Sequence, residues 1–131
     1  MKKYIMIFVL EISVVSTAMA ATWTKENCTD RGGTVVSITG GTFCRSNITM
    51  NWWSANVWCQ KHGGKLAGIA DLCPGTAPAA GQNCPDLFSC YWNVWSSDTA
   101  ASGQVLSFSG SCTDGHIYNI NQSDLKRAIC K

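Results

Sequence analysis

Eight cysteines are the residues of this chain with the clearest chemistry. An even number in a short chain is typical of a disulfide framework, which forms and persists in an oxidising compartment. Zinc is the alternative, but no Cys-x2-Cys pair exists, and His62 and His116 stand apart in the sequence. We therefore expect disulfides and neither a metal site nor a cofactor. The cysteines are Cys28, Cys44, Cys59, Cys73, Cys84, Cys90, Cys112 and Cys130.

Catalysis is not predicted from the remaining polar residues. An enzyme needs a nucleophile with a base, or two carboxylates that meet across a cleft, and no motif here brings such groups together. Asp71 with Asp86, or Asp98 with Asp114, are the carboxylate pairs that would have to meet in space. His62 is expected beside a helix C-terminus, where the helix dipole favours the cationic ring, which is a structural role. We therefore expect a chain that is not an enzyme.

A cluster of aromatic and polar residues gives the candidate ligand-binding site. Alternation along a strand sends Trp92 to the face opposite Tyr91 and Trp95, so one of these faces belongs to the core. An exposed aromatic ring beside amides and acids can stack on a sugar or anchor a protein. The alternative is that these rings pack under a loop. The candidates are Tyr91, Trp92, Asn93, Trp95 and Asp98.

A helix over about 52–62 is the element predicted most clearly. Asn51 can cap it, because its side-chain oxygen accepts a free backbone N–H of the first turn. Gly63 or Gly64 can end it in the left-handed conformation. At about 100° per residue, one side carries Trp52, Ala55, Asn56 and Cys59, so Cys59 should be buried and bridged, while Trp53 is expected to be half exposed.

The rest of the chain predicts short strands around this helix. Residues 34–38 and 42–44 form a hairpin turned by Gly40 and Gly41, and residues 65–69 are either a short strand or the entry to a second helix near 70–73. Residues 73–90 are rich in proline, glycine and alanine and form a loop. The ranges 91–97, 104–108, 116–120 and 127–130 read as strands of one mostly antiparallel sheet, which gives an α+β domain.

Residues 1–20 read as a secretory signal peptide, with Lys2 and Lys3 before an apolar stretch and an A-x-A site at 18–20. Glu11 inside that stretch is atypical, which leaves an uncleaved anchor or a pilin-like leader open. Residues 21–131 are then a single domain without a membrane span. The formal net charge is +2, and no concentrated basic face is evident, so nucleic acid is not an expected partner.

The order Asn-Trp-x-x-Ala-x-x-x-Cys-x-x-x-Gly-Gly-x-Leu-Ala-x-Ile, starting at Asn51, resembles the first helix and following strand of C-type lectin-like domains. In that family the helix cysteine pairs with one in the last strand, which implies a Cys59–Cys130 bridge. Long-form members also close an N-terminal hairpin, which Cys28 with Cys44 would fit. The pairing of Cys73, Cys84, Cys90 and Cys112 is left open, with Cys73–Cys84 and Cys90–Cys112 as one choice among several.

Sugar-binding members of the family hold calcium through a Glu-Pro-Asn or Gln-Pro-Asp triplet and a Trp-Asn-Asp triplet, and this chain has none of these. The stretches 91–98 and 105–110 are also similar to the Tyr-Trp-Ser-Ser-Thr and Val-x-Phe-x-x-Gly pattern of bacterial lectin-fold modules in surface adhesins, with an insertion before Trp95. The resemblance implies a compact, calcium-free recognition module that is secreted, periplasmic or on the cell surface. A protein ligand is the first expectation; calcium-independent sugar binding and a structural subunit of a surface appendage are the alternatives.

Overall fold

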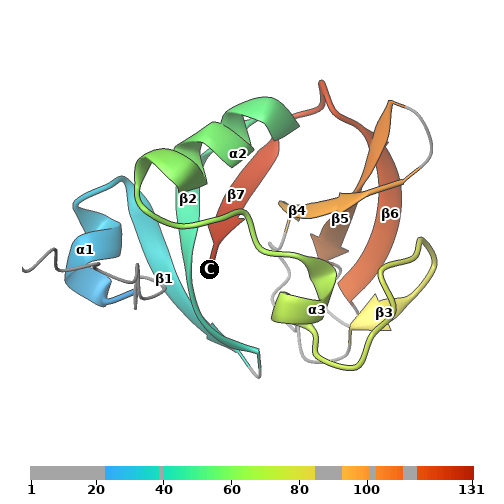
Figure 1. The fold of residues 1–131 in the computed structure, drawn as a ribbon, viewed down its shortest axis with the longest axis horizontal. Coiled ribbons are helices and arrows are strands. Elements are labelled where there is room, and N and C mark those ends of the chain that lie inside the picture. Colours follow the sequence, from blue (N-terminus) through green and yellow to red (C-terminus); the bar gives the residue numbers. More distant parts are fainter. Residues whose placement is uncertain (1–22, 39, 85–92, 101–102, 111–114) are drawn as a thin grey trace, which may run out of the picture.

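The computed structural model describes residues 23–38, 40–84, 93–100, 103–110 and 115–131. Its centre is one seven-stranded sheet in the order β1-β2-β7-β4-β5-β6-β3 (Figure 1). The chain is therefore α+β, as predicted. The elements are α1 (Lys25–Thr29), β1 (Gly33–Ile38), β2 (Gly41–Met50), α2 (Trp52–Lys61), α3 (Ile69–Leu72), β3 (Asn83–Cys84), β4 (Asn93–Thr99), β5 (Gln104–Gly110), β6 (Gly115–Asn121) and β7 (Lys126–Cys130).

The strand pairs are antiparallel except where β4 meets β7, which run parallel with Val94 opposite Arg127. The predicted N-terminal hairpin is confirmed as β1 and β2, turned at Gly41 with a positive φ of 132°. Strand β7 follows all the others in sequence but lies between β2 and β4 (Figure 1). It therefore joins the N-terminal hairpin to the rest of the sheet.

Helix α2 begins and ends where the sequence predicts. The Asn51 side chain accepts a hydrogen bond from the backbone N–H of Ser54 at 2.8 Å, which caps the first turn. Gly63 follows the helix with a φ of +82°, a conformation that costs glycine least. Ala55 and Cys59 are fully buried against the sheet, and Trp53 is 51% exposed, as the helical spacing indicated.

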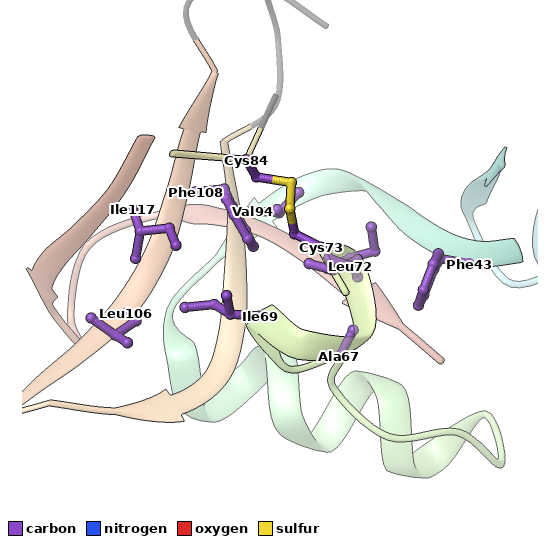
Figure 2. Packing of buried hydrophobic residues seen from close by; sticks show 11 residues of the cluster. Phe43, Ala67, Ile69, Leu72, Cys73, Cys84, Val94, Leu106, Phe108 and Ile117 are labelled. Carbon is purple, nitrogen blue, oxygen red and sulfur yellow. A yellow bond between two sulfur atoms is a disulfide. The ribbon is translucent and has the colours of Figure 1, made fainter. Parts of the chain in front are cut away.

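Both faces of the sheet are covered by apolar side chains. Neighbouring residues such as Phe43 and Cys44, or Ala128 and Ile129, belong to two different clusters, because successive side chains of a strand point to opposite faces. One cluster lies under α1 and α2. The other contains α3 and the disulfide between Cys73 and Cys84, as Figure 2 shows.

The segment that the sequence left open, 65–69, combines both expectations. Leu66 forms an antiparallel bridge with Cys130, and helix α3 begins three residues later at Ile69. The Gly68 N–H donates to Asp71 Oδ2 at 2.9 Å, which stabilises the start of this short helix. The 63–72 segment therefore passes from α2 to the opposite face of the sheet.

Three disulfides connect these elements: Cys28–Cys44, Cys59–Cys130 and Cys73–Cys84. The first ties α1 to β2, and the second ties α2 to β7. The third closes the loop between α3 and β3. Cys90 and Cys112 lie outside the described residues, as does the predicted signal peptide.

Candidate functional site

The five residues that the sequence offered as a ligand site do not form one surface in the described structure. Tyr91 and Trp92 lie outside the described residues. Asn93 is exposed at the start of β4, whereas Trp95 is fully buried. Trp95 is therefore a core residue, which corrects its placement among the candidate ligand contacts.

The burial of Trp95 follows from the position of its strand. In β4 the successive residues Val94 and Trp95 are both buried and belong to the apolar clusters on opposite faces of the sheet, so alternation no longer distinguishes inside from outside. The indole Nε1–H donates to the Met50 carbonyl oxygen at 2.7 Å. This hydrogen bond satisfies the buried ring nitrogen and holds the end of β2 against β4.

Asp98 also has a structural role. Its Oδ2 accepts a hydrogen bond from the backbone N–H of Ile69 at 2.7 Å, and the Ser96 hydroxyl lies 3.5 Å away. Asp71 lies close by and forms an ion pair with Lys131, with 3.0 Å between Oδ2 and Nζ. These carboxylates hold α3 against β4 and the end of β7.

An apolar groove lies between α2 and the second half of β2. Its volume is about 570 Å³. Three of its large apolar side chains are strongly exposed: Ile48 at 65%, Trp53 at 51% and Val57 at 60%. Trp58 and Met50 line it as half-buried residues. Ser54 and Lys61 complete the lining, and we call these seven residues the α2–β2 groove.

A bulge in β2 presents Ile48 to this groove. Between Arg45 and Thr49, β2 carries more residues than the facing segment of β7, so the register shifts. Such an insertion bends the strand and redirects a side chain, and bulges are frequent next to binding sites. Ile48 lies within the bulge, which explains why an isoleucine inside a sheet remains exposed.

The hydroxyl of Ser46 closes the gap that the bulge leaves in the ladder. Ser46 is fully buried; its Oγ accepts a hydrogen bond from the Ala128 N–H at 2.8 Å and donates one to the Ile48 carbonyl oxygen at 2.7 Å. One side chain thus satisfies two backbone groups that have lost their regular strand partners.

Ser46→Ala is expected to lower the free energy of unfolding by about 1–3 kcal/mol, because the Ala128 N–H and the Ile48 carbonyl would each lose a partner. Chemical denaturation measures this loss. Ser37→Ala, at an exposed position of β1, is the matched control and should change stability by no more than about 0.5 kcal/mol. Equal stabilities of the two variants would show that Ser46 does not support the bulge.

Aromatic and cationic groups lie at the end of the groove that is next to the last turn of α2. The Trp58 and His62 rings meet edge to face at 4.9 Å between centroids. Arg31 donates to the His62 carbonyl oxygen, and its guanidinium lies 5.4 Å from the centroid of the buried Trp23 ring. Burial, followed by the charges of Arg31 and Lys61, lowers the pKa of His62. His62 is therefore not stabilised as a cation, contrary to the expectation from the helix dipole alone.

A second, polar cleft lies on the other side of α2, with a volume of about 480 Å³. Amides, a hydroxyl and two lysines line it, and none of its lining residues is aromatic. The Asn56 amide already donates to the Trp52 carbonyl at 3.0 Å. The lining residues are Asn56, Gln60, Gly63, Gly64, Lys65, Leu66, Ser97 and Lys131.

Comparison of the chain with models of known protein families, with curated proteins and with solved structures found no match. The site therefore has to be interpreted from its own geometry. In the described ranges, no three His, Cys, Asp or Glu side chains gather where they could hold a metal ion. Of the helices described, none has the length and hydropathy that a membrane span requires.

Sequence reasoning identified Trp53 as half exposed but did not identify the groove. Val57 lies one helical turn after Trp53 and therefore on the same side of α2, so the helical spacing indicated the exposed apolar stripe. Ile48 had no such signal, because its exposure depends on the bulge against a strand nearly eighty residues later. The groove exists only once α2 and this bulge lie side by side.

Proposed function

We propose that this chain is an exported, non-catalytic recognition domain with a calcium-free C-type lectin-like scaffold, and that it binds a protein ligand through the α2–β2 groove. The observation that carries the proposal is the exposed apolar lining of the groove, formed mainly by Ile48, Trp53 and Val57. Contiguous exposed apolar surface on a soluble domain is typical of a protein interaction site. Aromatic residues are enriched among interface anchors, and Trp53 is placed to act as one.

The scaffold part of the proposal is supported by the disulfides. Cys59 of the main helix is joined to Cys130 of the last strand, and Cys28 is joined to Cys44 of the N-terminal hairpin. Both pairings are those that the resemblance to C-type lectin-like domains implies. Disulfides persist in oxidising compartments, which agrees with export to the periplasm, the cell surface or the medium.

Protein is favoured over sugar because of how the groups are distributed around α2. A sugar site needs an exposed aromatic ring flanked by convergent amides or acids. Here the exposed Trp53 lies in the apolar groove, whereas the amides of Asn56 and Gln60 lie in the polar cleft. In the described structure these two requirements are thus met on different sides of the helix.

Calcium-independent sugar binding is the second candidate, and the polar cleft is the observation that favours it. Its amides, the Ser97 hydroxyl and two lysines could hydrogen-bond to sugar hydroxyls. A glycan array probed with the disulfide-intact protein distinguishes the candidates. Sugar binding that Asn56→Ala removes and Val57→Glu leaves unchanged would replace the protein-ligand proposal.

Val57→Glu is expected to lower the affinity for a protein ligand at least about tenfold, because binding would bury the new carboxylate in an apolar site. The measurement is a selection of displayed short peptides on the disulfide-intact protein, followed by affinity titration of the enriched peptides. Leu125→Glu is the matched control, since Leu125 is 66% exposed and does not line the groove. If no peptide is enriched, or if both variants bind the enriched peptides as the wild type does, the groove is not the binding site.

A further inference from the structure

The α2–β2 groove is apolar along its length but carries a charge at one end. Lys61, in the last turn of α2, is the charged residue among the groove's lining residues, and no carboxylate lines the groove. Lys61 is exposed, and it takes no part in the ion pair that joins Lys131 to Asp71 in the described ranges. An exposed ammonium at the end of an apolar surface is available to a partner.

A second cation, Arg31, lies near this end of α2. Arg31 donates to the carbonyl oxygen of His62, the residue that follows Lys61. The charges of Arg31 and Lys61 both lower the pKa of the His62 ring, so both cations lie near it, but only Lys61 lines the groove. Acidic residues of the neighbouring helix, Glu26 and Asp30, are exposed and do not line the groove.

From this arrangement we infer that the groove binds an amphipathic peptide segment of its partner, whose apolar side chains contact Ile48, Trp53 and Val57 and whose carboxylate pairs with Lys61. The inference rests on the proposed function and adds the chemistry of the ligand. An apolar face laid into a hydrophobic groove is a recurring mode of peptide recognition. The charge at one end then fixes the direction in which the segment lies, since charge complementarity sets register and specificity more than affinity.

A second copy of this chain fits the groove less well. A symmetric dimer places the same patch on both subunits, so each groove would meet another groove. That arrangement brings Lys61 toward a surface that also carries lysine and no carboxylate. An acidic, apolar segment supplies the charge that a second groove lacks.

The test is a charge reversal read out by peptide selection. Short displayed peptides are selected on the disulfide-intact wild-type protein and, separately, on Lys61→Glu. The wild type should enrich apolar peptides that carry Asp or Glu at one end, and the variant should enrich Lys or Arg at the same position. A wild-type peptide should lose about three- to tenfold in affinity for Lys61→Glu, since exposed pairs are individually modest, and added salt should reduce that difference. Lys25→Glu, the same charge change on α1 outside the groove, should retain the wild-type preference.

The possible failures are distinguishable. In one outcome, the wild type enriches apolar peptides without a preference for Asp or Glu, and Val57→Glu abolishes their binding. This outcome would overturn the charge inference and leave the proposed function intact. If no peptide is enriched, or if the enriched peptides are insensitive to Val57→Glu, both proposals fail. Self-association in sedimentation experiments that Val57→Glu removes would assign the groove to a second copy and overturn the inferred partner.

Discussion

Replacing Cys59 and Cys130 together by alanine is expected to lower the free energy of unfolding by about 4 kcal/mol. The bridge spans a sequence separation of 71, and closing so long a loop removes much conformational freedom from the unfolded chain. It also joins α2 to the central strand β7, and both cysteines are fully buried. Small domains have total stabilities of about 5–15 kcal/mol, so this loss would be a large fraction of the total. Removing both cysteines avoids a free thiol.

The matched control is the Cys73→Ala, Cys84→Ala double variant. Its bridge spans a separation of only 11, so the same reasoning gives a smaller loss of about 3 kcal/mol. Both double variants are compared with the wild type by denaturant unfolding monitored by tryptophan fluorescence. If the Cys73→Ala, Cys84→Ala variant loses more free energy of unfolding than the variant without Cys59 and Cys130, loop closure does not set the stabilisation by the Cys59–Cys130 bridge. The inferred role of this bridge would then be wrong.

Trp95→Ala is expected to lower the free energy of unfolding by about 3–5 kcal/mol, the range for deleting a large buried aromatic side chain. Trp95 is the largest fully buried side chain of the described core. Its loss also removes the hydrogen bond to the Met50 carbonyl, which lies next to the Asn51 cap of α2. Trp95→Phe should recover part of the stability, because it refills most of the volume without the N–H donor.

Trp53→Ala is the control for Trp95→Ala. Trp53 is 51% exposed, so its removal should cost no more than about 1 kcal/mol. The measurement is again denaturant unfolding, with circular dichroism as the signal because each variant changes the tryptophan fluorescence. Similar losses at the two positions would contradict the assignment of Trp95 to the core and return it to the candidate ligand contacts.

Local signals predicted the local elements of this fold well. Asn51 and Gly63 mark the ends of α2 because capping and the left-handed conformation depend on the residue itself and its nearest neighbours. The hairpin at Gly41 was predictable for the same reason. Ala55 and Cys59 were placed on the buried side by helical spacing alone.

Features that depend on long-range pairing were not predictable in this way. The parallel contact between β4 and β7 at Val94 and Arg127 has no signal in either strand. The complete burial of Trp95 could not be read from alternation either, because alternation assumes one exposed face, whereas β4 has an apolar cluster on each face. The exposure of Ile48 depends on the Ser46 hydroxyl replacing a strand partner, and this contact forms only in the assembled sheet.

The position of β7 has a consequence for how the chain folds. Strand β7 is the last of the seven to be synthesised, yet the sheet is incomplete without it because it separates β2 from β4. The hairpin β1–β2 and the group of β4, β5, β6 and β3 can therefore pair internally but cannot join until residues 126–130 have arrived. Contacts between residues so distant in sequence slow folding. The complete sheet is thus expected to form only after residues 126–130 have been synthesised.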